Sequence, residues 1–520
     1  MAVSITTDLV TLYTANTAFG GGTVYTGFQR FGTGCNGFQA NTANTNFHRY
    51  GTVTSFNLVG KSIYSWMIGP ASIDTYANGG YRIVIGDGTN IRAYFVGGRD
   101  LKSFSSQGWY CFILNGDNLP TNFTQIAGAS QPNLSNLTQV GVGFRATTKA
   151  TGNSPNCFYD VARYGTGLVI GGGTSADPGK FSEILSQDDS INNAWGIIES
   201  LGTGIYGVQG RLTFGSTTSS SYFEDINSTI VYENRLVSTS FYQFNVQGSS
   251  ANTNVFQLGT KLGTGDNASG LNGCTIQSSD PVLKINFTGT NVNNLNIYGS
   301  TFYNCKDTID LSTNNNHEFI GNTIIKSGQV NANQMYIRNC FFNNTYSTDS
   351  SLLWNNTIDI RNSSFIGNSD ITNNPAAIEH DSTGTYNYYD LLFLNNDYDV
   401  LNTSNGQVTI NSINTSNPST FLNQGTSTTT INNVRTFKLT GLKENTEIRL
   451  IRKTDRFEID GIENSGTEYE YQYNYTGDIE IYVHIHNLQY EFIRLESILT
   501  STNTTIPIQQ NFDRNYKNPV

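Results

Sequence analysis

An eight-residue signature recurs through the second half of this 520-residue chain and constrains its fold more than any other feature. It reads apolar, any, apolar, any, Gly/Asn/Ser, two small or polar residues, then apolar. Two clear copies start at Leu295 and Ile358, and the others start at positions 269, 317, 335, 391 and 408, so neighbouring copies are 17 to 33 residues apart. Repeats of this size are supersecondary units that bury their apolar faces only by stacking on one another.

The order of residues within each copy predicts its conformation. Positions one and three of a strand point to the same side, so both apolar residues face one interior. The fifth residue is Gly or Asn in six copies, and these two types adopt a positive φ most readily. A sharp turn there lets the apolar eighth position begin a second short strand that faces the same interior.

Several short strands in each turn of about 22 residues predict a parallel β-helix. Leucine-rich repeats have a similar period, but they need a leucine framework and a helix-compatible half. This chain, rich in Asn, Thr and Ser, has neither.

Other β segments flank the repeats. Residues 63–68 and 157–164 are examples of short alternating segments bounded by glycine turns, which are typical of a β-sandwich. Asp177-Pro178 predicts the start of a short helix. The predicted organisation is a β-sandwich at 1–175, a connector with a short helix at 176–200, the β-helix at 201–435, a small β-domain at 436–499 and an extended tail at 500–520.

Within the C-terminal domain, apolar and polar residues alternate strictly. Tyr469, Tyr471, Tyr473 and Tyr475 alternate with polar residues, a Thr-Gly-Asp turn follows, and residues 479–486 alternate again. Two such strands around a turn predict a β-hairpin. The tyrosine stripe is either a sugar-stacking platform or the core face of the strand.

Composition supports an all-β protein. Aromatic residues make up 12% of the chain, charged residues only 13%, and glycines number 52, which is typical of folded β structure and excludes general disorder. A formal net charge of −11 with no basic stripe excludes nucleic acid as the main partner. The six cysteines show no CxxC pair or metal-ligand spacing, so we expect free thiols.

The chain shows no signal of secretion or of a bound cofactor. The N-terminus has no basic n-region or long apolar stretch, and no run of about 18 apolar residues occurs. We therefore expect no signal peptide, no membrane span, synthesis in the cytoplasm and no cofactor.

Two carboxylate pairs are candidates for catalysis. Glycosidases need two carboxyl groups about 5–9.5 Å apart. Glu379 and Asp381 are two residues apart on a strand-like segment, and Asp397 and Asp399 form a second such pair. Both pairs flank the end of the longest interval between copies, 358–391, where we expect an inserted loop. The alternative is that all four are solvated surface acids.

Three further motifs are candidates for ligand binding. His484 and His486 point to one face of a strand and are candidate metal ligands if three chains meet on an axis; alternatively they are simply exposed. Residues 87–90 with Asp100 offer loop oxygens for Ca²⁺, although such residues often bind their own backbone. Residues 171–173 form a glycine run without the GK[ST] continuation of a phosphate loop.

The chain resembles known families in three regions. Trp66, residues 108–114 and residues 158–165 resemble a laminin-G/concanavalin-like jelly roll, and residues 205–435 resemble the pectate-lyase-type right-handed β-helix. The order of domains is similar to that of large structural proteins of tailed bacteriophages, as are residues 253–259 and 506–510. The acidic clusters and the basic catalytic residue of β-helix lyases are not matched.

This resemblance implies a virion component, assembled in the host cytoplasm as a homotrimer with other virion proteins as partners. The leading hypothesis is a non-enzymatic fibre, spike or surface appendage involved in host attachment or glycan binding. One alternative is a tailspike glycoside hydrolase or polysaccharide lyase that uses the β-helix carboxylates. A second alternative is a connecting or decorating virion protein that binds no glycan.

Overall fold

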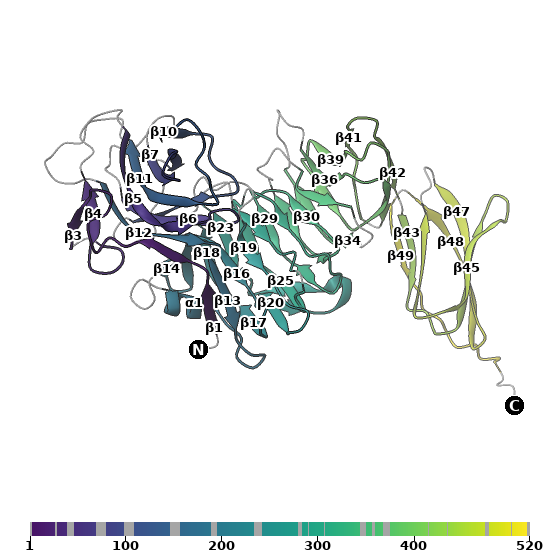
Figure 1. The fold of residues 1–520 in the computed structure, drawn as a ribbon. Helices are drawn as coiled ribbons and strands as arrows, with labels where there is room; N and C mark the ends of the chain where they lie inside the picture. The colour runs from purple at the N-terminus through teal and green to yellow at the C-terminus, as the bar shows by residue number, and fades with distance from the viewer. Residues whose placement is uncertain are drawn as a thin grey trace. The chain divides into compact units, whose positions relative to one another are not determined.

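The chain is all-β, and nearly every element of the computed structural model is a strand (Figure 1). Two compact units comprise Met1–Leu353 and Trp354–Val520. The structure describes residues 3–26, 29–38, 46–68, 80–97, 109–145, 157–188, 195–232, 242–278, 283–289, 291–305, 307–343, 350–355, 359–367, 375–413, 415–433, 435–473, 478–500 and 502–516.

The first unit begins with two antiparallel sheets that form a β-sandwich. One has the order β3-β4-β12-β6-β9, with β2 also on β12, and the other has the order β10-β8-β7-β11-β5. The strands are β2 (Val10–Tyr13), β3 (Thr23–Tyr25), β4 (Cys35–Phe38), β5 (Asn46–Phe56), β6 (Ser62–Ile68), β7 (Gly80–Gly86), β8 (Ile91–Gly97), β9 (Tyr110–Asn115), β10 (Phe123–Ala127), β11 (Leu137–Arg145) and β12 (Cys157–Gly165). Their inner faces share one core that includes Ile83, Phe112 and Phe144.

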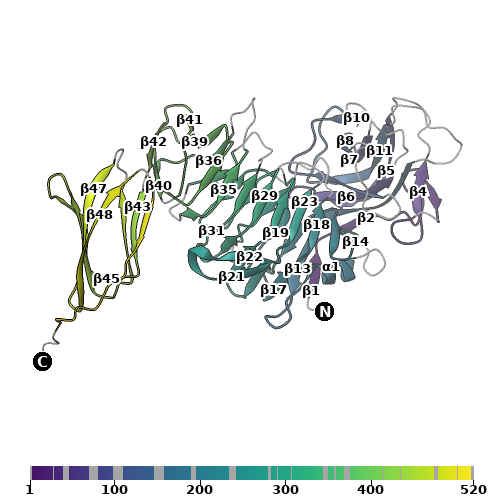
Figure 2. The same cartoon turned by 180° about the vertical axis from the view of Figure 1, so that it is seen from behind.

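Three parallel sheets follow in the same unit and form a parallel β-helix (Figure 2). The first contains β13 (Leu168–Gly172), β16 (Leu212–Phe214), β19 (Tyr242–Val246), β24 (Lys284–Asn286), β27 (Ile309–Asp310) and β30 (Val330–Ala332). The second contains β15 (Ile205–Val208), β18 (Thr229–Tyr232), β23 (Thr275–Ser278), β26 (Thr301–Tyr303), β29 (Thr323–Ile325) and β32 (Phe341–Asn343). The third contains β17 (Ser221–Asp225), β20 (Asn254–Leu258), β25 (Asn294–Tyr298), β28 (Glu318–Ile320) and β31 (Tyr336–Arg338).

The first coil is joined to other elements of its unit. β1 (Val3–Thr7) pairs antiparallel with β13, and β14 (Ile198–Gly202) pairs antiparallel with β15. The helix α1 (Phe181–Asp188) starts three residues after Pro178, and its first N–H donates to Asp225 at 2.7 Å. Asp188 ends the helix, is buried, and accepts hydrogen bonds from the N–H groups of residues 196–198.

Identical positions of successive repeats stack in register. Ile297 is paired with Phe319 and Phe319 with Ile337, while Phe302 lies beside Ile324 in the next sheet. All are at most 2% exposed. Burying such side chains stabilises the fold by roughly 1.5–3 kcal/mol each relative to exposure, and this is what joins one coil to the next.

The predicted bend is present in five copies. Gly299, Gly321 and Asn339 have φ of 55°, 69° and 54°, and in the second unit Asn362 and Asn395 have φ of 52° and 54°. The bend prediction is therefore confirmed at these positions. The copy at 391 nevertheless lies one sheet further on, because Asn395 follows β38 (Leu392–Leu394), and the bend equivalent to Gly299 in that coil is Asp390, with a φ of 53°.

The prediction that a repeat copy starts at 269 is wrong. Leu271 is 47% exposed and belongs to β22 (Ser269–Leu271), which pairs with β21 (Thr260–Leu262) as a hairpin outside the coil. The bend of this coil is Gly259, with a φ of 76°, directly after β20. The hairpin is inserted between that bend and β23, so the apolar pattern of the coil is interrupted there.

The second unit contains further β-helix strands. β33 (Leu352–Trp354) contains the division between the units. The sheets of the second unit contain β34 (Ile360–Arg361), β37 (Gly384–Tyr389), β40 (Gln407–Ile413) and β42 (Thr428–Asn433); β35 (Ser364–Ile366) and β38 (Leu392–Leu394); and β36 (Ala376–His380), β39 (Tyr398–Asn402) and β41 (Phe421–Asn423). Much of the loop expected within 358–391 lies outside the described residues.

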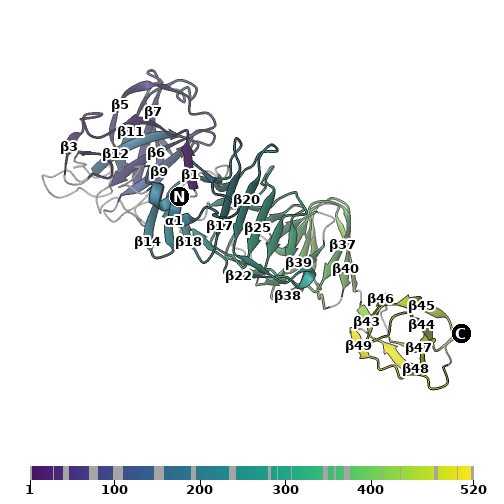
Figure 3. The ribbon, with the colours of Figure 1, turned by 90° about the horizontal axis from the view of Figure 1, so that it is seen from below.

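Two sheets around one core form the C-terminal domain (Figure 3). One contains β46 (Glu468–Tyr473), β43 (Arg435–Thr440) and β49 (Thr504–Pro507), and the other contains β45 (Glu458–Ser465), β44 (Thr446–Arg452), β47 (Ile479–Asn487) and β48 (Tyr490–Leu499).

The predicted hairpin of this domain is wrong, because β46 pairs with β43 whereas β47 pairs with β44 and β48. Both strands have one apolar face, and placing them in opposite sheets lets those faces pack together. Tyr469 and Tyr473 are buried in this core and Tyr471 packs against it, whereas Tyr475 lies outside the described residues.

Candidate functional site

The carboxylates Glu379 and Asp381 lie on either side of a buried histidine. Glu379 accepts a hydrogen bond from the Thr403 hydroxyl at 3.1 Å, and the exposed Asp381 accepts one from Ser382 at 3.0 Å. His380 points inward, with Nδ1 2.6 Å from the Trp354 carbonyl oxygen and Nε2 2.9 Å from the Tyr388 hydroxyl. Burial lowers the pKa of His380 to about 3, so this imidazole is neutral and structural.

The pair Asp397 and Asp399 occupies two different environments. Asp397 is exposed, whereas Asp399 is 5% exposed. Oδ2 of Asp399 accepts hydrogen bonds from the N–H groups of Ser419 and Thr420 at 2.8 and 3.2 Å, and from the Ser419 hydroxyl at 3.2 Å. Asp399 thus holds the backbone of the following coil in place.

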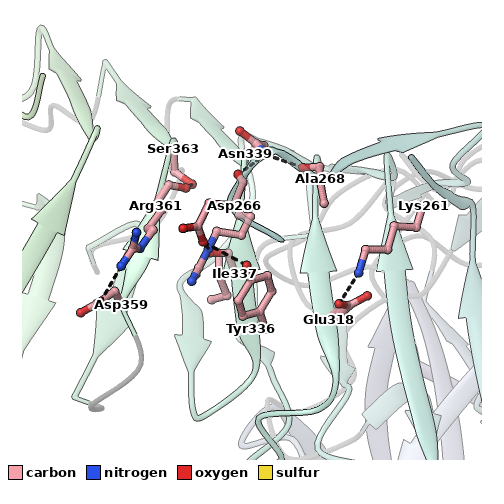
Figure 4. Close-up of polar contacts among 11 residues, drawn as sticks. Lys261, Asp266, Ala268, Glu318, Tyr336, Ile337, Asn339, Asp359, Arg361 and Ser363 are labelled. Atoms are coloured by element: carbon pink, nitrogen blue, oxygen red, sulfur yellow. Dashed lines mark hydrogen bonds and ion pairs between the residues drawn. The ribbon is translucent and has the colours of Figure 1, made fainter. Parts of the chain in front are cut away.

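The inserted β21–β22 hairpin lies against the third sheet of the first unit (Figure 4). Nζ of Lys261 is 2.5 Å from Glu318, and Asp266 accepts hydrogen bonds from the Tyr336 hydroxyl at 3.1 Å and from Nε of Arg338 at 2.8 Å. Asn339, one of the bend residues, donates its side-chain amide to the Ala268 carbonyl. These groups bond to one another, so the contact fixes the hairpin on the third sheet.

A small pocket on the C-terminal domain contains both candidate histidines. Strands β44 and β47 bury alternate residues in the core, β48 packs Ile493 and Leu495 half-buried against it, and the intervening residues lie on the outer face. On that face Glu447 is opposite His486, and Arg449 is opposite His484. These four residues and Phe492 line a pocket of about 250 Å³.

Phe492 supplies an exposed aromatic surface to this pocket. Its side chain is 55% exposed. The ring packs edge-to-face on His484 at 5.4 Å between centroids, and its centroid is 6.4 Å from that of His486. The alternation in the sequence identified the two histidines, but Glu447, Arg449 and Phe492 come from other strands and were not predicted.

In and around the pocket, three carboxylates share one guanidinium, that of Arg449. Arg449 is 2.8 Å from both Glu447 and Glu458 and 3.7 Å from Glu463. Its hydrogen bond lowers the pKa of Glu447, which also lies 3.5 Å from Nδ1 of His486. Burial, with the nearby Arg494 and Arg456, lowers the pKa of His484 and favours its neutral form.

Of the candidate Ca²⁺ ligands, Asp87 binds nearby backbone N–H groups. Oδ1 of Asp87 accepts hydrogen bonds from the N–H groups of Thr89 and Asn90 at 2.9 and 2.7 Å, and Oδ2 accepts one from Asn133 at 2.8 Å. These bonds, that of Asn90 foremost, lower the pKa of Asp87 to about 2. Asp100 lies outside the described residues, and the glycine run ends β13.

All six cysteines are buried free thiols, as predicted. Across the described ranges, no group of three or more His, Cys, Asp or Glu side chains is arranged to hold a metal ion. The metal site shared by three chains remains a prediction. No helix among the described residues is long and apolar enough to cross a membrane.

Comparisons with known proteins give little further information. No protein-family model matches the chain, and no curated protein matches it. Among solved structures it is similar to a catalytic domain of a GH87 alpha-1,3-glucanase in complex with nigerose, at 11% identity and a TM-score of 0.19, covering 83% of this chain and 96% of that one. A GH87 alpha-1,3-glucanase catalytic domain in complex with tetrasaccharides gives 12% identity and a TM-score of 0.15, covering 84% and 76%. At such TM-scores the similarity carries no functional inference.

Proposed function

We propose that this chain is a non-enzymatic structural protein of a bacteriophage virion, a fibre, spike or surface appendage that takes part in host attachment. The observation that supports this most is the use of Asp399, whose carboxylate binds the backbone of the next coil. A catalytic acid of a glycosidase must face its substrate and exchange a proton with it. A buried carboxylate that holds a loop contributes to a rigid scaffold instead.

Stacking of the coils is the physical basis of this role. Each parallel strand is covered by the next, so few strand edges are exposed to proteases or to aggregation. In the second unit, the amide of Asn411 donates to Asn387 at 2.9 Å, and that of Asn432 donates to Asn411 at 3.2 Å. Such a ladder fixes the register of the coils.

The alternative function is cleavage of a polysaccharide by Glu379 and Asp381, because Glu379 is near the end of β36 and the exposed Asp381 directly follows that strand. The test is incubation of the full-length protein with a broad panel of bacterial envelope polysaccharides, with reducing ends and unsaturated products measured. We expect no product. Release that is abolished in the double variant Glu379→Gln/Asp381→Asn would contradict the proposal and establish the enzyme.

A connecting virion protein without contact to glycan is the third possibility. Antibodies against the full-length chain distinguish it from a surface appendage when they are applied to intact particles. Surface labelling supports the attachment role, whereas particles that contain the chain but remain unlabelled would contradict it.

A further inference from the structure

The pocket on the C-terminal domain has the chemistry of a sugar-binding site. A pyranose ring presents an apolar face of C–H groups and an edge of hydroxyl groups. A ligand site of this kind needs an exposed aromatic surface and a few fixed polar groups around it. Phe492 offers the aromatic surface, and Glu447, Arg449, His484 and His486 surround it.

One nitrogen in the pocket lacks a partner. Nε2 of His484 is shielded from solvent, and no described residue makes a hydrogen bond to it. A shielded polar atom without a hydrogen bond costs free energy, and a ligand hydroxyl that reaches it removes this cost. The exposed ring of Phe492 packs edge-to-face on this imidazole, so a sugar that stacks on the ring lies beside His484.

The charges of the pocket select the class of sugar. Arg449 is surrounded by the carboxylates of Glu447, Glu458 and Glu463, so its charge is already compensated. An anionic sugar would approach three carboxylates that share one guanidinium, while the other nearby cations, Arg456 and Arg494, are stacked on the ring of Tyr482 and do not line the pocket. A neutral sugar avoids this repulsion and still finds charged acceptors and donors for its hydroxyl groups, which make stronger hydrogen bonds than neutral ones.

We propose that the pocket formed by Glu447, Arg449, His484, His486 and Phe492 binds one neutral pyranose unit of a glycan. The inference deepens the proposed attachment role and rests on it for the source of the glycan, a bacterial surface. The sugar stacks on Phe492 and its hydroxyl groups bind Glu447 and the histidines. No bond of the sugar is broken.

Ligand-observed NMR on the full-length protein tests this inference. Glucose, galactose, mannose and N-acetylglucosamine are titrated beside glucuronic acid and N-acetylneuraminic acid. We expect saturable binding of at least one neutral sugar and at least tenfold weaker binding of both acids. Binding of none of the neutral sugars, or tighter binding of an acidic one, would overturn the proposal.

Two variants place the binding in this pocket. Phe492→Ala removes the aromatic surface, and His484→Phe keeps a ring but deletes the unpartnered nitrogen; we expect each to weaken binding at least tenfold. Phe457→Ala is the matched control, because Phe457 is 59% exposed on the same domain and does not line the pocket. Thermal unfolding checks that all variants fold.

If Phe492→Ala binds as tightly as Phe457→Ala, the pocket is not the site. That result leaves the virion role intact, because antibody labelling of particles tests it separately. Conversely, sugar binding by a chain that is absent from particles would refute the virion role and leave the pocket assignment standing.

Discussion

At the scale of single residues, the bends of the β-helix depend on a left-handed backbone conformation that Gly and Asn adopt at lower cost than most residue types. Asn395 has a φ of 54° and an exposed side chain, so its identity is set by the backbone and not by packing. A left-handed conformation costs other L-residues about 1–2 kcal/mol.

We therefore expect Asn395→Gly to leave the free energy of unfolding nearly unchanged and Asn395→Ala to lower it by about 1 kcal/mol. Chemical denaturation of both variants measures the difference. Equal stability of the two variants would mean that the bend does not require a left-handed residue.

A second residue-scale prediction concerns His380 and acid. Its pKa is about 3 in the folded chain, against an ordinary value of about 6.5 in the unfolded chain. Below pH 6.5 the unfolded state binds a proton that the folded state excludes, so the free energy of unfolding falls as the pH drops toward 3. The slope from this one group approaches about 1.4 kcal/mol per pH unit.

His380→Asn keeps a donor toward the Trp354 carbonyl and removes the titration. We expect the variant to lose stability less steeply than the wild type between pH 6.5 and pH 4, as measured by denaturation at a series of pH values. Parallel curves for the two proteins would show that His380 is not buried in its neutral form.

At the scale of elements, the β21–β22 hairpin is held by a backbone contact that leaves no room for a side chain. A Cβ on Gly270 would lie 1.9 Å from the backbone nitrogen of Gly299 and 2.7 Å from the Ile320 carbonyl oxygen. Because backbone atoms cannot turn aside as a side chain can, Gly270→Ala must displace the hairpin.

We expect Gly270→Ala to expose residues 260–271 to limited proteolysis and to faster amide hydrogen exchange, while the coils themselves stay folded. Gly171→Ala is the control, because its nearest contact would be an ordinary 3.4 Å to the Ser4 hydroxyl. Unchanged protection of the hairpin in Gly270→Ala would contradict this account.

The same hairpin shows where sequence information ends. The repeat predicted the inward residues and five left-handed bends because period and residue type determine both locally. It failed at Leu271, since a strand in an inserted hairpin has the same alternation as a strand of the coil. The predicted pairing of β46 with β47 was wrong for a similar reason. Alternation identifies the buried face of a strand but does not determine which sheet the strand joins.

Most residues of the candidate site could not be predicted from local sequence patterns. Two residues apart on one strand, His484 and His486 were identified from alternation alone. Glu447 and Arg449 are brought opposite them by the pairing of β44 with β47, and Phe492 comes from β48. No local pattern in the sequence encodes that register.

At the scale of the whole molecule, the chain is all-β, Asp399 of the β-helix binds the backbone of the next coil, and the pocket around Phe492 lies on the C-terminal domain. In a virion, we expect three copies to assemble into one appendage.

Whether the chain is a structural component of virus particles is tested by cryo-electron microscopy of purified particles combined with labelling by antibodies against the chain. We expect a surface appendage with threefold symmetry into which this β-helix fits, and antibody labelling on that appendage. Particles that lack the chain altogether, identified by mass spectrometry of the same preparation, would contradict it.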